Sequence, residues 1–154
     1  MHSKIIRISK YPLPKPEYVD VSVYTSNGFV GKVADYVGVI DQAAREKFLV
    51  ELDESDAFRV EGDCLIIADP DAYFESKYEE FCDRLNFLGF ASYSDFCHNL
   101  RLETDIARLS SAYDDKNGLY VHMELDGMQT FDHWMRSVER GDRFYIGDIL
   151  DYHF

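Results

Sequence analysis

The chain has 154 residues, enough for one domain with a hydrophobic core, and its hydrophobic content of 46% is that of an ordinary globular protein. Its formal net charge of −13 argues against direct binding to nucleic acid or to an anionic membrane, because phosphate groups would repel it. Residues 1–20 contain no apolar stretch typical of a secretion signal and no long apolar run occurs elsewhere, so we predict neither secretion nor a membrane span; the three cysteines show no Cys-x-x-Cys spacing. We therefore expect a cytoplasmic protein with free thiols.

The first quarter of the chain is predicted to be mostly strand. Residues 4–8 form a short apolar run, and alternating valines predict a half-buried strand over residues 18–24. The Asn-Gly dipeptide at 27–28 favours a type I′ turn, because both of its central residues need positive φ angles. This turn would lead into a returning strand over residues 29–33. Residues 34–40 fit either a helix or a strand.

A helix and a hairpin are predicted next. Asp41 can cap a helix that runs to about Leu52. Residues 58–60 and 64–68 are expected to pair as a hairpin. The second of these strands contains an uninterrupted Leu-Ile-Ile run, which is typical of a central strand.

The clearest helix signal covers residues 69–89. Asp69 can cap this helix, Pro70 fits its first turn, and Gly89 can end it in the left-handed conformation. Five apolar residues fall within roughly 80° of one another and are expected to face the core. They are Phe74, Tyr78, Phe81, Leu85 and Leu88.

Ser92 and Asp95 form the pattern of a capping box, which begins the following helix. The apolar residues change faces near residues 101–103, so we predict a break there. A turn over residues 114–118 leads into a strand over residues 119–125, in which every second residue is apolar.

Thr130 is expected to cap a short helix that buries Trp134 and that Gly141 ends, before a last strand over residues 143–149. The order of these elements predicts an α+β fold. We expect a single domain, residues 1–154, with a mostly antiparallel sheet and three to five helices packed on one face.

Acidic side chains are concentrated in the middle third of the chain. Residues 51–83 carry 12 acidic residues and two basic ones, a net charge of −10. Within the predicted helix, Glu75, Glu79 and Asp83 place like charges four residues apart, which costs about 0.3 kcal/mol per pair. A charge pattern that lowers the stability of the protein alone indicates that a partner binds it. The alternative interpretation of the same charges is an ordinary solvated helix face in an acidic protein.

We therefore expect a non-catalytic binding protein, without cofactor or metal, that occludes a basic protein partner. Carboxylates could imitate the phosphates of DNA in the groove of a restriction enzyme, an RNA-guided effector or a repressor, or neutralise a basic toxin. Small acidic inhibitors of phages and mobile elements, and immunity proteins, act in this way. The expected partner-binding residues are Glu75, Glu79 and Asp83, then Glu51, Asp53, Glu54 and Asp56, with Asp71 and Glu80.

Two other classes of function stay open. His122 and Glu124 share the polar face of a predicted strand, and with His133 they would suit a small hydrolase-like or metal-dependent enzyme. The sequence has no H-E-x-x-H or comparable ligand spacing. Exposed aromatic residues and an unpaired strand edge would instead suit a structural protein that forms homo-oligomers, such as a homodimer.

Two further motifs are interpreted structurally. Residues 113–124 resemble a calcium-binding loop superficially, but Tyr113 occupies the first ligand position and a strand follows, so we predict a plain turn. Cys97 and His98 are adjacent, and on a helix their side chains point about 100° apart, which does not suit a catalytic pair. Cys97 is expected to be buried.

Overall fold

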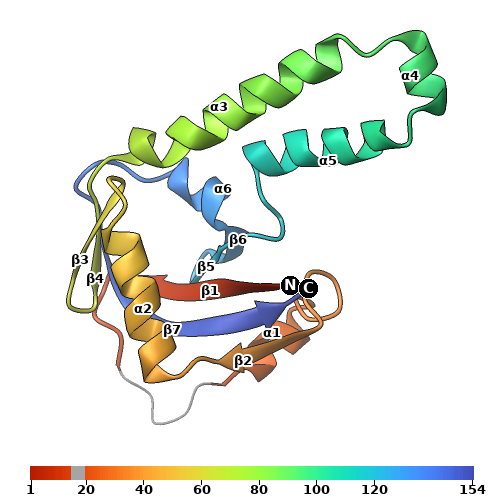
Figure 1. Ribbon diagram of the computed structural model, residues 1–154. Helices are drawn as coiled ribbons and strands as arrows, with labels where there is room; N and C mark the ends of the chain where they lie inside the picture. The colour runs from red at the N-terminus through yellow and green to blue at the C-terminus, as the bar shows by residue number, and fades with distance from the viewer. Residues whose placement is uncertain (15–19) are drawn as a thin grey trace.

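The computed structural model describes residues 1–14 and 20–154 of the chain. It contains a seven-stranded sheet and, within these residues, six helices (Figure 1). The predicted α+β fold with a mostly antiparallel sheet is confirmed. The elements are β1 (His2–Ser9), α1 (Ser22–Ser26), β2 (Tyr36–Val39), α2 (Gln42–Asp53), β3 (Phe58–Glu61), β4 (Cys64–Ile67), α3 (Pro70–Gly89), α4 (Tyr93–His98), α5 (Arg101–Tyr113), β5 (Tyr120–Met123), β6 (Gly127–Thr130), α6 (Phe131–Met135) and β7 (Arg143–His153).

The long strand β7 organises the sheet. β1 pairs antiparallel with one edge of β7, from His2 opposite His153 to Ser9 opposite Tyr145. The other edge is shared, because β4 pairs with the first part of β7 and β2 with its last part. β5 adds to β1 in parallel, and the path runs β3-β4-β7-β1-β5-β6. β4 is thus an interior strand, as its apolar run predicts.

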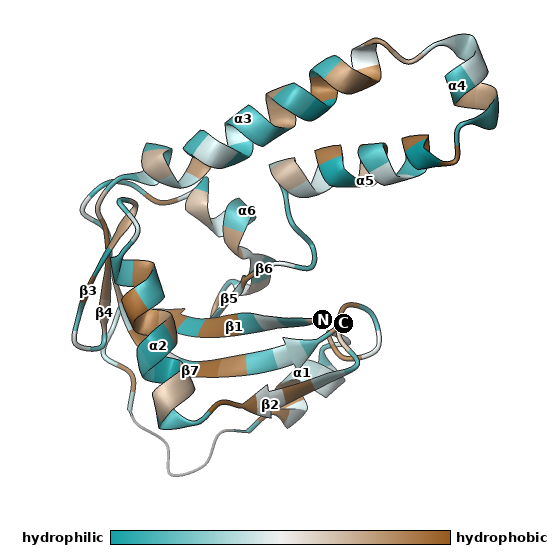
Figure 2. Ribbon diagram, in the orientation of Figure 1, coloured by the Kyte–Doolittle hydropathy of each residue, from teal (hydrophilic) through white to brown (hydrophobic). Residues whose placement is uncertain are grey.

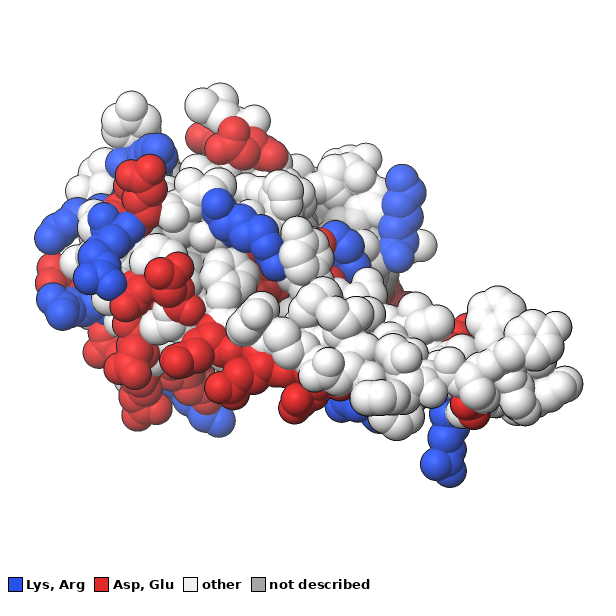
Figure 3. Space-filling model, turned by 90° about the horizontal axis from the view of Figure 1, so that it is seen from above, with Lys and Arg blue, Asp and Glu red and all other residues white. Residues whose placement is uncertain are grey.

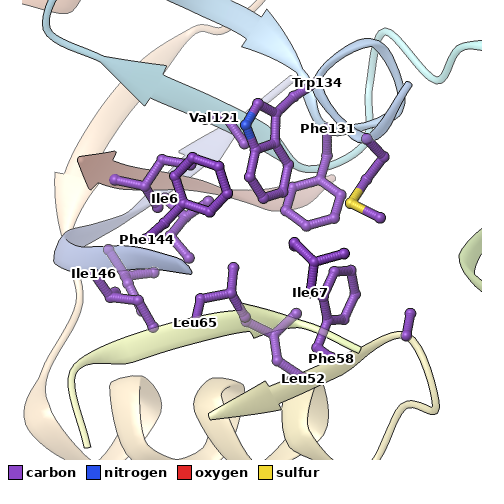
Figure 4. Packing of buried hydrophobic residues seen from close by; sticks show 14 residues of the cluster. Ile6, Leu52, Phe58, Leu65, Ile67, Val121, Phe131, Trp134, Phe144 and Ile146 are labelled. Atoms are coloured by element: carbon purple, nitrogen blue, oxygen red, sulfur yellow. The ribbon is translucent and has the colours of Figure 1, made fainter. Parts of the chain in front are cut away.

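Two hydrophobic clusters cover the two faces of the sheet, because successive strand residues point to opposite sides. The larger cluster lies between the sheet and helices α2 and α6, where Phe131 and Trp134 of α6 pack over Val121 and Ile6 (Figure 4). The smaller cluster joins Tyr24 and Phe29 to Tyr120 and Tyr152 of the strands. Helical structure therefore lies on both faces, and the expectation of one covered face is wrong.

The segment that covers the second face differs most from the prediction. Residues 22–26 form α1, so the strand predicted over residues 18–24 is wrong where it falls in the described residues; residues 15–19 lie outside them. Asp20 accepts a hydrogen bond from the Ser22 N–H at 2.9 Å, which favours the first turn of a helix. Burial of Tyr24, which is 3% exposed, decides against the strand that the valine alternation suggested.

The predicted hairpin at residues 27–28 is also wrong. Asn27 has a φ of −82°, and of the two residues Gly28 takes the left-handed conformation, with a φ of +79°. Gly28 therefore ends a helix instead of closing a type I′ turn. The strand predicted over residues 29–33 is a turn with one isolated bridge between Val30 and Ala34.

The predicted helix caps are confirmed. Asp41 accepts the Ala44 N–H at 2.8 Å, and the Asp69 side chain accepts the Asp71 N–H at 3.2 Å. Ser92 and Asp95 form a complete capping box. Thr130 accepts the His133 N–H at 3.2 Å. The break predicted near residues 101–103 is found slightly earlier, at residues 99–100 between α4 and α5.

Four boundaries differ from the prediction. α6 ends at Met135, well before Gly141, which was expected to end it. α3 includes Gly89 and ends at Phe90 with a right-handed φ of −94°, so the left-handed glycine cap is wrong. The strand predicted over residues 119–125 ends at Met123, because the chain turns there and returns as β6, which sequence analysis missed. β7 continues past residue 149 to His153, where β2 and β1 both pair with it.

Helices α3, α4 and α5 form an arm that extends away from the sheet, with α6 between its base and the strands (Figure 1). We call residues 70–113 the helical arm. α3 packs mainly on α5, its first turns also contact the larger cluster, and none of its residues is fully buried. The predicted core-facing stripe is therefore right at Phe74 and wrong further along the helix, where Tyr78 is 68% exposed and Leu85 51% exposed. Cys97 is exposed near the end of the arm, against the expectation that it is buried. No helix in the described ranges is long and apolar enough to cross a membrane.

Candidate functional site

Two acidic segments meet at the base of the helical arm. One is the end of α2 with the loop after it, and the other is the first half of α3. Ala57 in the loop joins them, since its carbonyl accepts the N–H groups of Ala68 and Asp69 at 2.9 and 3.2 Å. Asp53 fixes the same corner, because its carboxylate accepts the Val60 N–H at 2.6 Å. In Figure 3, Asp and Glu side chains gather beside the base of the arm.

All nine predicted partner-binding residues are exposed. We call them the acidic surface: Glu51, Asp53, Glu54, Asp56, Asp71, Glu75, Glu79, Glu80 and Asp83. The Ala57 hydrogen bonds bring the members from α2 and its loop next to the start of α3. The members further along α3 follow a row with an axial spacing of about 6 Å per four residues, so the row extends roughly 18 Å from Asp71 to Asp83.

The protein's own cations neutralise few of these carboxylates. Glu51 pairs with Lys47 at 3.7 Å and Glu80 with Arg84 at 3.8 Å, and pairs at such exposed positions contribute little. Within residues 1–14 and 20–154, seven members of the acidic surface form no ion pair. They are Asp53, Glu54, Asp56, Asp71, Glu75, Glu79 and Asp83. Most of its negative charge is therefore open to a partner.

A hollow of about 460 Å³ lies in the acidic surface. Its walls include the carboxylates of Asp69, Asp71 and Glu75, and the rings of Phe74 and Tyr78. Carboxylates beside an exposed ring can pair with a cation that also lies over the ring face. Asp69 already pairs with the protein's own Arg140 at 2.8 Å, so Asp71 and Glu75 are the carboxylates that a further lysine or arginine side chain would meet in this hollow.

The structure does not assemble His122, Glu124 and His133 into the site that the enzyme alternative requires. His122 is half-buried on β5, and its Nδ1 lies 2.9 Å from the Tyr24 hydroxyl. Glu124 lies in the turn after β5, and His133 is exposed on α6. Within the described ranges, no three His, Cys, Asp or Glu side chains are arranged to hold a metal ion.

The environment of His122 makes stability depend on pH. Burial lowers the pKa of His122, Arg7 lowers it further, and Glu124 opposes them. The unfolded chain then binds more protons than the folded one, so stability is fully present above the unfolded pKa of about 6.5 and falls as the pH drops below it.

We expect His122→Asn to reduce the loss of stability between about pH 6.5 and 5, measured by urea unfolding at each pH. The exposed His133 provides the matched control, since His133→Asn should leave the slope unchanged. Equal slopes in the parent and in His122→Asn would contradict the expectation.

Sequence analysis missed the residues that hold the arm. Asp132 on α6 is 3% exposed and accepts hydrogen bonds from the Tyr73 hydroxyl at 2.7 Å, Lys77 Nζ at 3.1 Å and the Asp115 N–H at 2.7 Å. Burial, and then the bond to Asp132, raise the pKa of Tyr73 far above its usual value. We call this cluster the arm socket. In the sequence, the arm socket is indicated only by one carboxylate, Asp132, among the apolar residues of a short predicted helix.

Arg136 completes the arm socket from the other side. Its guanidinium donates to the carbonyl of Asp132 at 2.9 Å and to the carbonyl of Tyr113. It also lies over the rings of Phe74 and Tyr113, 5.0 and 4.2 Å from their centroids. The start of α3 and the end of α5 are thus both tied to α6 and Arg136 at the base of the arm. The acidic surface on α3 is therefore held in a fixed relation to the sheet.

No known protein family, curated protein or solved structure matches this chain.

Proposed function

We propose that this protein is a non-catalytic inhibitor or immunity-type protein that occludes a basic partner with its acidic surface. One observation carries the proposal: Ala57 joins two acidic segments whose carboxylates are mostly without cationic partners in the described part of the chain. Gathered like charges repel one another and reduce stability. A basic partner would turn this repulsion into attraction.

The chemistry of the surface favours a protein that binds nucleic acid, or a basic toxin, as that partner. A row of carboxylates along α3 presents negative charge at regular intervals, as a phosphate backbone does. The hollow beside Tyr78 suits one lysine or arginine of the partner. Such an interaction associates fast and weakens as salt rises, because exposed charges are screened.

The proposal is tested with two triple variants that remove equal charge. The first, Glu75→Gln with Glu79→Gln and Asp83→Asn, alters the acidic surface. The control, Glu46→Gln with Glu124→Gln and Glu139→Gln, alters exposed carboxylates outside it. Proteins captured from lysate by the parent at low salt, and released at high salt, are identified, and their affinity for each variant is measured.

We expect the first variant to bind the captured partner about 10- to 100-fold more weakly, since each lost pair contributes up to about 1 kcal/mol. The control should change affinity less than about threefold. Equal loss in both variants would mean that net charge, not this surface, matters, and the proposal would fail. If the partner binds DNA, the parent protein should compete with that DNA.

A further inference from the structure

Apolar side chains line one flank of the helical arm. Tyr78 and Leu85 are seven residues apart on α3, and Ile106 and Tyr113 are seven apart on α5, a separation that returns to the same side of a helix. Tyr78 and Tyr113 line one hollow of about 300 Å³ at the base of the arm, so both pairs face the same side. All four are more than half exposed.

The flank continues to the end of the arm. Ile106 lines a second hollow, of about 310 Å³, together with Phe96 and Leu100. Phe96 is 76% exposed and Leu100 is 92% exposed. Apolar residues recur along the whole arm in Figure 2. In Figure 3, the surface of the arm beyond its base is mostly uncharged. We call these six residues the apolar flank: Tyr78, Leu85, Phe96, Leu100, Ile106 and Tyr113.

The area of the apolar flank suits a protein interface. Six large side chains at these exposures leave on the order of 700 Å² open to water. A monomer's largest apolar patch is about 300–600 Å², whereas each side of a stable interface buries about 800 Å². The flank is therefore large for a surface that stays in water and about right for one that is covered.

The charge of the outer part of the arm favours a second copy of this chain as the occupant. Residues 84–113 carry three arginines and three acidic residues, a net charge of zero, whereas the base of the arm, residues 70–83, carries one lysine and five acidic residues and the whole chain carries −13. Two copies repel each other elsewhere, but they can meet at this neutral segment. A basic partner would be drawn to the acidic surface instead.

The two ends of the flank are also complementary. Arg136 lines the hollow at the base, and its hydrogen bonds go to backbone carbonyls; within the described residues it forms no ion pair, although the Asp114 carboxylate attracts it at longer range. Glu103 lines the hollow near the far end. A two-fold axis with the arms antiparallel would bring Glu103 of each copy toward Arg136 of the other.

We propose that the protein is a homodimer in which two helical arms pack antiparallel through their apolar flanks. The seven-residue repeat on α3 and α5 suits four-helix packing at crossing angles of about 20°. Glu79 and Asp83 lie about 100° and 140° around α3 from Tyr78, so these two carboxylates stay open in the dimer, whereas Asp71 and Glu75 lie on the same side as Tyr78 and border the interface. The dimer thus presents two acidic surfaces, and its existence does not depend on what those surfaces bind.

The test measures the mass of the full chain by light scattering from about 1 to 100 μM. We expect twice the chain mass of 17.9 kDa. Leu85→Lys with Ile106→Lys should give the single-chain mass, because lysines in the flank would be buried without partners. Val50→Lys with Leu125→Lys, at exposed apolar positions outside the arm, should leave the dimer intact.

Circular dichroism of each variant checks that helix content is kept, and Phe96→Ser with Leu100→Ser provides a second disruption at highly exposed positions. High salt should leave the dimer intact while it releases a basic partner, so the two proposals fail independently. A parent that stays at 17.9 kDa throughout, or a dimer that persists in both flank variants, overturns the inference.

Discussion

Replacing Asp132 by alanine is expected to lower the free energy of unfolding by about 3–5 kcal/mol, because the change removes one partner of a buried ion pair. Lys77 would lose the carboxylate that lies 3.0 Å from its Nζ. The Tyr73 hydroxyl and the Asp115 N–H would lose their acceptor. Buried donors without acceptors add to the cost.

Urea unfolding followed by the fluorescence of Trp134 measures this loss, since this residue lies two positions from Asp132 on α6. Asp132→Asn keeps an acceptor but not the charge, so its loss should be intermediate. The exposed Asp126 is the control, and Asp126→Ala should stay within about 0.5 kcal/mol of the parent. A loss below about 1 kcal/mol for Asp132→Ala would show that the arm socket does not hold the arm.

The sequence predicts best those elements whose signals are local. Asp41, Ser92 and Thr130 each cap a helix through a side chain that bonds a backbone N–H three residues later. The β3–β4 hairpin follows from two apolar runs around Gly62, which takes a φ of +63°. Such features depend on a few neighbouring residues, so a single sequence contains them.

The helical arm could not be predicted, because periodicity shows which residues share a face but not what covers that face. Phe81 was expected to face the core, yet it packs beside Tyr113 of α5. Tyr78 shares the same stripe and is mostly exposed. Whether an apolar stripe meets the sheet, another helix or a second molecule depends on tertiary contacts that local pattern does not encode.

The acidic surface was predictable in composition and not in shape. The acidic residues of the middle third can be counted in the sequence, but the contact between Ala57 and Asp69 that brings two segments together is tertiary. The role of Asp132 was harder to predict, since the groups that bond its side chain are 17 to 59 residues away in the chain. Buried polar clusters of this kind are specified by long-range geometry.

Replacing Trp134 by alanine is expected to cost about 3–5 kcal/mol of stability. Its side chain is 2% exposed, and its ring centroid lies 5.0 Å from that of Phe131 and 5.1 Å from that of Phe144 (Figure 4). The cavity would open in the cluster that joins α6 to the sheet, where close-packed neighbours can relax only in part.

The exposed ring of Phe90 on the arm is the matched control for the buried ring of Trp134. Phe90 is 89% exposed, so Phe90→Ala removes a large ring that contributes little to folding and should cost less than about 0.5 kcal/mol. Urea unfolding followed by circular dichroism compares the two without relying on tryptophan fluorescence. Similar losses for both variants would contradict the expectation, whereas a large difference would mean that the exposed ring of Phe90 is not needed for folding and that the buried ring of Trp134 is.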